Sequence, residues 1–218
     1  MSIKPISLIA VCAAISGLLG GCKTVAPYDY SNYRAHPPRS ILVLPPLNES
    51  LNLDGTYSYL STVTQPVADH GYYVFPVAVV DRFLKENGMP TAGEMQQIPL
   101  DKAASILGAD AVLFLTLKQY GSKYQLLNSV TTVEVQARLV DTRTATLLWS
   151  GHALKQVNPN NSGGGILASL VAAAVSQIIN AKTDSAHQVS RMANVDLFEQ
   201  KTVGLPYGPY SPRFNQFP

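Results

Sequence analysis

The chain has 218 residues, a length that fits one domain or at most two. Only 14% of the residues are charged, against about 25% in typical soluble domains, so some part of the chain dilutes the charge. With 16 basic and 14 acidic residues the net charge is +2, which provides no basic field and excludes nucleic acid as the expected partner. The cysteines, Cys12 and Cys22, both lie near the start, so the remainder can form no disulfide or Cys-ligated metal site.

Residues 1–21 are predicted to be an export signal, with Lys4 as the positive region and an apolar run up to Leu19. The sequence Leu19-Gly20-Gly21-Cys22 resembles the lipobox of bacterial lipoproteins. This resemblance implies that Cys22 becomes the lipidated first residue, and that this covalent lipid is the only cofactor. Lys23, in place of Asp, resembles an outer-membrane sorting signal. The alternative is an ordinary secretory signal that happens to precede a cysteine.

Residues 22–38 are rich in Tyr, Pro and polar side chains without a helix or strand period, which predicts a tether between lipid and domain. Residues 39–200 are predicted to form a single domain. Its first elements, in chain order, are a strand over 40–44, a helix over 55–70 that Pro66 kinks or ends early, a short β-prone stretch over 72–77, a helix over 78–87, a helix over 101–107 closed by Gly108, and a buried strand over 111–117.

The segment from Val130 to Val157 carries the clearest local pattern. Val133, Val135, Ala137 and Leu139 alternate with polar residues, which is the period of a strand with one face in solvent. A polar turn over 141–146 follows, and alternation then resumes. We predict an antiparallel hairpin on a soluble sheet; the alternative is a pair of strands in an oligomeric membrane barrel.

A Gly-rich loop leads into an uncharged segment over 166–181 with apolar residues at helical spacing. Its apolar stripe is a candidate for self-association, and consists of Leu170, Val171, Ala174, Val175 and Ile178. Core packing is the main alternative, and membrane insertion is disfavoured because 16 helical residues rise only about 24 Å. A second helix over 184–200 is predicted to turn Val189, Met192, Ala193 and Leu197 inward.

Residues 201–218 are predicted to form an extended tail. Pro206, Pro209 and Pro212 recur every three residues, which is the period of polyproline II. Such a ribbon would present Tyr207 and Tyr210 as a surface for a protein partner.

The chain shows no pattern typical of an enzyme. Its four histidines are scattered without a second ligand type at metal spacing, so no metal site is expected. The Gly-rich loop over 162–165 lacks the Lys and Ser or Thr of a phosphate-binding loop, and no Gly-x-Ser-x-Gly elbow is present. An envelope hydrolase stays as a rival that would require a nucleophile, a histidine and a carboxylate to converge.

Four segments together resemble a known domain: Ile-Leu-Val-Leu-Pro-Pro from Ile41, His-Gly-Tyr-Tyr-Val-Phe-Pro from His70, Leu-Gly-Ala-Asp-Ala-Val-Leu from Leu107, and the hairpin sequence from Ala137. They are similar to the domain shared by the amino-terminal part of TolB, the curli secretion lipoprotein CsgG and the penicillin-binding-protein activator LpoB. The whole chain resembles a family of outer-membrane lipoproteins without an established activity, which includes a meningococcal genome-derived antigen.

This resemblance implies an α/β (α+β) fold of the TolB amino-terminal type, a mixed β-sheet flanked by helices, in a chain that forms a homodimer. Ala145 departs from the related domains, which commonly have Gly in that turn; a different turn would suffice to accommodate it. The long inserted hairpins of the CsgG pore are absent. We therefore expect a lipid-anchored, periplasm-facing component of the outer membrane with a structural or protein-interaction role, and a secretion-pore subunit as the alternative.

Overall fold

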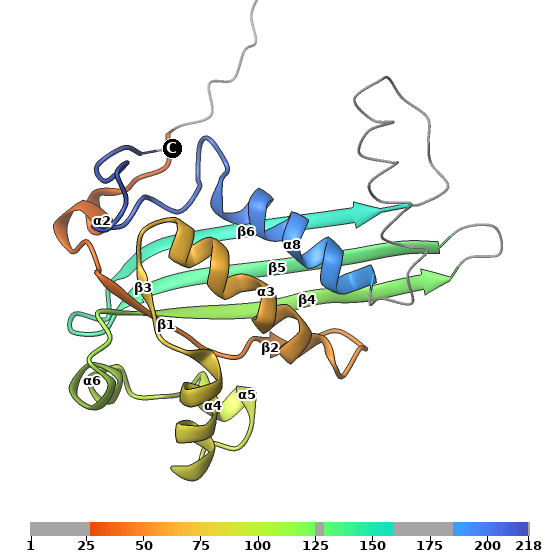
Figure 1. Cartoon of the computed structure of the whole chain (residues 1–218), viewed down its shortest axis with the longest axis horizontal. Coiled ribbons are helices and arrows are strands. Elements are labelled where there is room, and N and C mark those ends of the chain that lie inside the picture. The colour runs from red at the N-terminus through yellow and green to blue at the C-terminus, as the bar shows by residue number, and fades with distance from the viewer. Residues whose placement is uncertain (1–26, 125–128, 159–184, 218) are drawn as a thin grey trace, which may run out of the picture.

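The computed structural model describes residues 27–124, 129–158 and 185–217 (Figure 1). The helices are α2 (Ser31–Ala35), α3 (Gly55–Asp69), α4 (Val77–Glu86), α5 (Ala92–Met95), α6 (Leu100–Lys102), the π-helical turn η1 (Ala103–Leu107) and α8 (Ser185–Phe198). The strands are β1 (Ser40–Val43), β2 (Leu47–Asn48), β3 (Tyr73–Val74), β4 (Ala111–Tyr124), β5 (Ser129–Asp141) and β6 (Leu147–Val157).

The six strands form one mixed sheet in the order β3-β1-β4-β5-β6, with β2 beside β4. β1 is parallel to β3 and β4, whereas β4, β5 and β6 are antiparallel neighbours. The expected mixed sheet with flanking helices is therefore confirmed, and so is the hairpin predicted over 130–157. β4 runs to Tyr124, beyond the predicted 111–117. The prediction ended too early because the second half of the strand is more polar than a buried strand.

β1 is buried on both faces, which explains its uninterrupted apolar sequence. Ile41 and Val43 belong to the larger core beneath α3 and α8. Leu42 and Leu44 belong to a second core formed with residues of α4, α5 and η1. The smaller helices thus cover only the β1 end of the second sheet face.

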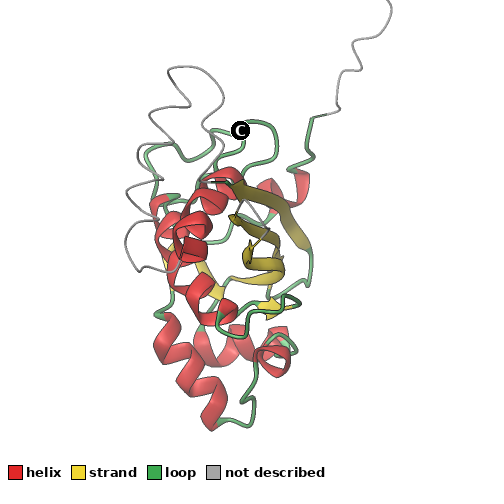
Figure 2. Cartoon of the chain, turned by 90° about the vertical axis from the view of Figure 1, so that its right-hand side faces the viewer, coloured by secondary structure: helices red, strands yellow, loops and turns green. Residues whose placement is uncertain are grey.

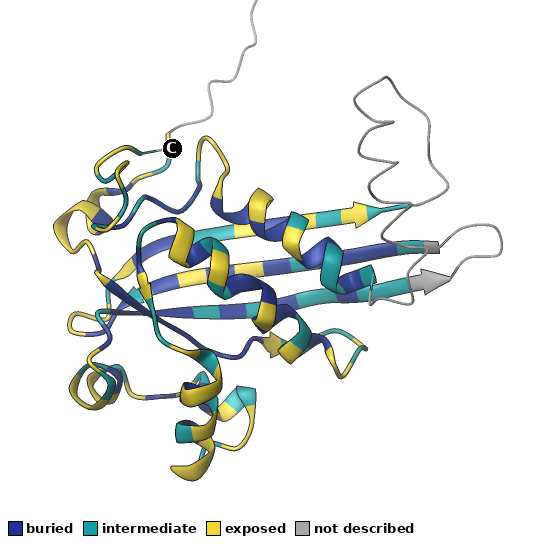
Figure 3. Cartoon of the chain, in the orientation of Figure 1, coloured by how far each residue is buried: buried dark blue, intermediate teal, exposed yellow. Residues whose placement is uncertain are grey.

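β5 and β6 bury only one face, as their alternation predicts. The bands of buried and exposed residues along these strands are visible in Figure 3. Val135, Ala137 and Trp149 point into the larger core. Most helices lie to one side of the strands (Figure 2). The second face of β5 and β6 therefore carries half-buried and exposed polar side chains.

α3 and α8 pack on the sheet side by side (Figure 1). Pro66 lies inside α3 and does not end it early, since the helix continues to Asp69. A buried polar contact joins the two helices: the Tyr59 hydroxyl donates to the Asn194 amide oxygen, and the Asn194 amide donates to the Thr62 carbonyl at 2.9 Å. Because these polar groups satisfy one another, they are accommodated in the apolar layer.

The predicted tether over 22–38 is wrong for its second half. Tyr30 and Tyr33 are 3% and 1% exposed, and α2 begins at Ser31. Tyrosines at these positions pack into the core because residues far along the chain supply their partners. The folded body therefore begins at Tyr28, whose hydroxyl accepts a hydrogen bond from the Ser150 backbone at 2.8 Å.

The predicted extended tail over 201–218 is also wrong. Leu205 is 1% exposed and packs in the larger core. The Gly208 N–H donates to the His70 carbonyl at 2.8 Å, and the Tyr210 N–H donates to the Gly71 carbonyl at 3.1 Å. These backbone hydrogen bonds hold the segment against the domain. A free polyproline ribbon would not form them.

The turn between β5 and β6 places one residue in the left-handed region that glycine adopts most readily. Ala145 has φ 56°, so an alanine occupies this unfavourable region. Asp141 holds the turn, because its carboxylate accepts hydrogen bonds from the Arg143 and Thr144 N–H groups at 3.0 and 2.8 Å.

Candidate functional site

Several predicted site residues lie outside the described part of the chain. These are Cys22 and the self-association stripe of Leu170, Val171, Ala174, Val175 and Ile178. Both stay predictions. No described helix is long and apolar enough to cross a membrane, and the described residues contain no group of His, Cys, Asp and Glu that could hold a metal ion.

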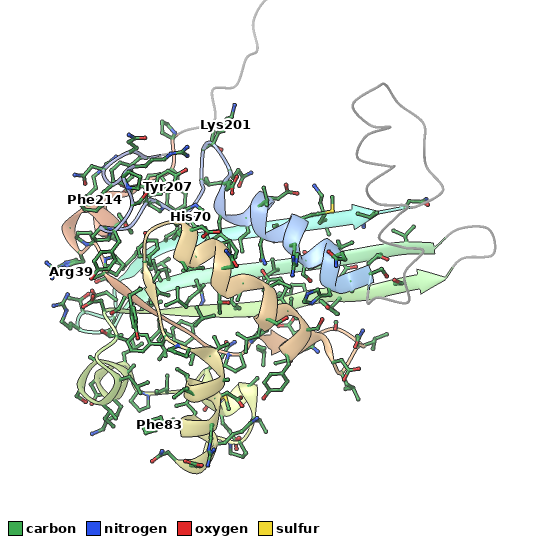
Figure 4. The ribbon with its side chains drawn as sticks, in the orientation of Figure 1. Arg39, His70, Phe83, Lys201, Tyr207 and Phe214 are labelled. Atoms are coloured by element: carbon green, nitrogen blue, oxygen red, sulfur yellow. The ribbon has the colours of Figure 1, made fainter. Side chains whose placement is uncertain are left out.

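Tyr207 and Tyr210, the predicted partner surface, have different environments. The Tyr207 ring stacks on His70, with ring centres 5.1 Å apart and planes at 14°, and its hydroxyl accepts a hydrogen bond from Arg213 at 2.8 Å. Tyr210 is 67% exposed. Figure 4 shows Tyr207 directed toward His70. Only Tyr210 has the free surface that a partner would require.

The two ends of the described chain are joined by a cluster of tyrosines. We call residues 28–36 together with 201–217 the terminal latch. The Tyr30 hydroxyl donates to the Gly204 carbonyl at 2.8 Å. The Tyr72 hydroxyl donates to the Pro206 carbonyl at 2.6 Å, which leaves the Tyr33 hydroxyl as the donor to Tyr72, also at 2.6 Å. Burial raises the pKa of Tyr30 and of Tyr33 to about 12.

β6 is an edge strand of the sheet, and the latch covers only its first part. The Ser150 N–H points away from β5 to the Tyr28 hydroxyl, and the Asn32 amide donates to the Leu147 carbonyl at 3.1 Å. Since backbone groups alternate in direction along an antiparallel strand, the N–H and C=O of His152, Leu154 and Gln156 also point outward. No described segment pairs with this second part of the edge.

Beside this open edge, the exposed sheet face carries a row of polar side chains. His152 Nε2 lies 3.1 Å from Glu134 Oε1, and the Gln119 amide donates to Glu134 Oε2 at 2.7 Å. These hydrogen bonds, first that of His152 and then that of Gln119, hold the pKa of Glu134 below its usual value. Leu154, 48% exposed on the same strand, adds an apolar side chain. A polar face with one exposed leucine suits contact with a protein better than binding of a small apolar ligand.

A cavity of about 510 Å³ lies between the loop over 49–52 and β4. Its carboxylate, Glu49, is paired with Lys118 at 2.7 Å, and its described lining includes no histidine. Elsewhere Ser58 Oγ approaches His187 Nδ1 to 3.5 Å, and no described carboxylate hydrogen-bonds to that histidine. Neither place brings together the three groups that the rival hydrolase hypothesis requires.

Sequence reasoning predicted the hairpin and missed its open edge. The edge follows from the complete strand order, which local sequence patterns do not determine. The capping of that edge by Tyr28 was not predictable from local pattern, since the two partners are 122 residues apart.

The larger part of the chain, residues 28–210, matches the family model described as "Putative lipoprotein GNA1162-like". The chain belongs to this family. The GNA1162-like match begins at Tyr28, at the start of the latch, and ends at residue 210 in its C-terminal part, so it spans most of the described domain. The expected family membership is confirmed.

Relatives of the GNA1162-like family agree with this assignment. The chain is 44% identical over 191 residues to "Putative lipoprotein NMB1124/NMB1162" of Neisseria meningitidis serogroup B, covering 87% of this chain and 89% of the relative. The crystal structure of lipoprotein GNA1162 from Neisseria meningitidis is 49% identical and covers 66% of this chain and 100% of that chain, with a TM-score of 0.55. Both names describe a lipoprotein and neither states a catalytic activity.

A more distant likeness is to the C-terminal domain of LpoB from Salmonella enterica. It is 15% identical and covers 64% of this chain and 90% of that chain, with a TM-score of 0.41. This likeness is too distant to carry an inference about function.

Proposed function

We propose that the protein is a lipid-anchored lipoprotein of the outer membrane that faces the periplasm and serves as a protein-interaction component of an envelope assembly, without catalytic activity. The observation that carries the interaction role is the open part of the β6 edge, from His152 to Gln156. An uncovered edge strand offers hydrogen-bonding groups to a strand of another chain. Natural proteins usually protect such edges, and among the described residues only the latch does so here, over the first part of β6.

The anchoring part of the proposal rests on Cys22 and on the lipoprotein family to which the chain belongs. Acyl chains contribute about 0.8 kcal/mol per buried CH₂, so several chains on one cysteine anchor a protein firmly. Once residues 1–21 are removed, Cys22 is the only cysteine left, so replacing its thiol removes the attachment point.

The anchor is tested by the substitution Cys22→Ser in the full chain. We expect the protein to leave the membrane fraction and appear in the soluble envelope fraction. The matched control is Ser31→Cys, which adds an exposed thiol behind an intact lipobox and should leave the membrane association unchanged. Retention of the Cys22→Ser protein in the membrane would contradict the anchor.

The interaction surface is tested by placing a photo-crosslinking amino acid at Leu154 in cells, with Val79 on α4 as the control. Both side chains are exposed, at 48% and 65%, so the two positions differ in location more than in access. We expect a discrete crosslinked species from position 154 and none from position 79. Equal labelling from both positions would show that the β6 edge is not a preferred contact.

The mass of the crosslinked species distinguishes the partners. A species of twice the chain's mass would indicate a homodimer through β6, and a species of any other mass would indicate another envelope protein. The self-association stripe is tested separately by Ala174→Glu, which should dissociate a dimer that forms through that stripe. Detergent-extracted rings that conduct ions would replace the proposal with the pore alternative.

A further inference from the structure

The terminal latch places the start and the end of the described chain in one location. Tyr28 packs against Tyr30 with ring centres 4.7 Å apart, and Tyr30 against Phe217 at 5.3 Å. The Arg34 guanidinium lies over the Phe217 ring at 4.2 Å. In Figure 1 the beginning of the described chain and the C label lie at the same end of the sheet. Any constraint on the position of Tyr28 therefore applies equally to the C-terminal segment.

The distance from the proposed lipid to Tyr28 is short. Cys22 lies only six positions before Tyr28, with five residues between them. A fully extended chain spans at most about 3.6 Å per residue, so the reach is about 20 Å. By comparison the 14 residues of β4 extend over about 45 Å. A lipid on Cys22 therefore keeps the latch close to the headgroups, whatever the tilt of the domain.

This end of the domain is basic at its surface. The exposed basic side chains of the latch and the adjoining turns are Arg34, Arg39, Arg143, Lys201 and Arg213. In the described part of the chain none of the five forms an ion pair within 4 Å. The exposed acids nearby are Asp29, Asp69 and Glu199. Basic groups therefore outnumber acidic groups on this surface.

Two further acidic groups at this end, Asp110 and Asp141, are less exposed than the basic side chains. Asp110 accepts hydrogen bonds from the Arg39 and Ser40 N–H groups at 3.0 and 3.2 Å. Asp141 is 1% exposed and holds the β5–β6 turn. Tyr210 adds an exposed aromatic ring to the same surface, and Figure 4 shows Arg39, Lys201 and Phe214 at this end of the molecule.

We propose that this surface, formed by the latch, Arg39 and Arg143, docks on the anionic phospholipid headgroups of the membrane that holds the anchor. The inference rests on the proposed lipidation of Cys22. Arg and Lys bind lipid phosphates, and Tyr is enriched at the interface between membrane and water. A short tether keeps the surface at high effective concentration near the lipid, so even individually weak contacts are formed.

The test attaches the mature chain, residues 22–218, to vesicles through Cys22, which is its only thiol. Maleimide-headgroup lipid in phosphatidylethanolamine vesicles with 30% phosphatidylglycerol supplies the link. Hydrogen exchange is then compared with that of the same chain capped by a small maleimide in solution. We expect exchange in residues 207–217 to slow at least threefold on the vesicles, while α4 is unchanged.

The charge requirement is tested by Arg39→Gln/Arg143→Gln/Lys201→Gln, whose side chains form no hydrogen bond that holds the latch. Each basic residue near an anionic surface favours binding by a factor of about five, so the triple change should weaken docking about 100-fold and abolish the slowing. The matched control, with the same loss of charge on the α4–α6 side, is Arg82→Gln/Lys85→Gln/Lys102→Gln, and it should retain the slowing.

The outcomes separate this inference from the anchor itself. Unchanged exchange in 207–217, or slowing confined to α4, would overturn the docking surface. Equal slowing on neutral phosphatidylcholine vesicles would overturn its assignment to anionic headgroups. Because the maleimide supplies the lipid, these results do not depend on lipidation in cells, which the Cys22→Ser fractionation tests independently.

Discussion

The Tyr72 hydroxyl bonds to both parts of the terminal latch, so its removal tests how the C-terminal segment is held. Tyr72 is 4% exposed and donates to the buried Pro206 carbonyl. Tyr72→Phe leaves that carbonyl without its donor, and leaves the Tyr33 hydroxyl with only the longer contact to the Tyr207 carbonyl, at 3.3 Å. An unsatisfied buried polar group costs about 1–3 kcal/mol.

We therefore expect Tyr72→Phe to lower the free energy of unfolding by about 2 kcal/mol. For a domain of this size that corresponds to a fall in Tm of about 4–8 °C. The neighbouring substitution Tyr73→Phe is the matched control, because Tyr73 is 52% exposed and no described residue hydrogen-bonds to its hydroxyl. Urea denaturation of the two variants and the parent measures the difference.

Hydrogen exchange distinguishes a local effect from a global one. If the latch opens separately from the rest of the domain, a loss of 2 kcal/mol raises exchange at the Gly208 and Tyr210 amides about 30-fold, with little change in β5. A Tyr72→Phe protein that is no less stable than Tyr73→Phe, with unchanged exchange at both amides, would refute the argument that these hydroxyl groups secure the segment.

Two further predictions concern single features of the fold. Ala145→Gly should raise the free energy of unfolding by about 0.5–1 kcal/mol, because relief of the left-handed φ exceeds the entropy that glycine adds to the unfolded chain. The control Ala78→Gly, on the exposed side of α4, should lower the free energy of unfolding by about 0.5 kcal/mol. If urea denaturation shows a lower free energy of unfolding for both variants, this reasoning is contradicted. The raised pKa values of Tyr30 and Tyr33, about 12 against 10, mean that the folded state holds protons that the unfolded state releases, so stability should be complete below pH 10 and decline as pH rises through 12. Urea midpoints by circular dichroism at pH 9, 10 and 11 measure this decline, and a constant midpoint would contradict it.

The sequence predicts those elements whose burial follows a regular pattern. β5 alternates because one of its faces is in the core and the other in solvent, and β1 is uniformly apolar because a core lies on each side of it. The positions of α3, α4 and α8 follow for the same reason. In each case the residues that determine the structure are neighbours in the sequence.

The two ends were predicted wrongly because their order comes from distant partners. Tyr30 and Gly204 are 174 residues apart, and Tyr33 and Tyr72 are 39 apart. Proline spacing at 206, 209 and 212 indicated an extended ribbon, whereas backbone hydrogen bonds to His70 and Gly71 determine its course. One signal could have corrected the tether: three tyrosines within six residues are unusual for a solvated linker, because such linkers contain few aromatic residues.

The candidate site divides in the same way. Cys22 was identifiable because a processing signal is a local pattern, and it stays a prediction together with the stripe around Ala174. The open edge of β6 required the complete strand order, which depends on contacts between segments. Tyr207 shows the limit of composition alone, since its ring is engaged by His70 within the molecule, whereas Tyr210 is free.

The anchor and the open edge are compatible because of the direction in which β6 runs. The strand starts at Leu147, beside α2 in the latch, and leaves the latch toward Val157. Val157 lies seven positions after Ser150, which Tyr28 caps, a distance of about 23 Å along the strand. If the latch lies on the headgroups and the strand points away from them, the open part of the edge lies in the aqueous space beyond the bilayer. Tyr28, at the end of the tether, also covers the part of the β6 edge nearest the lipid. A partner strand can therefore pair with β6 only where the membrane does not obstruct it.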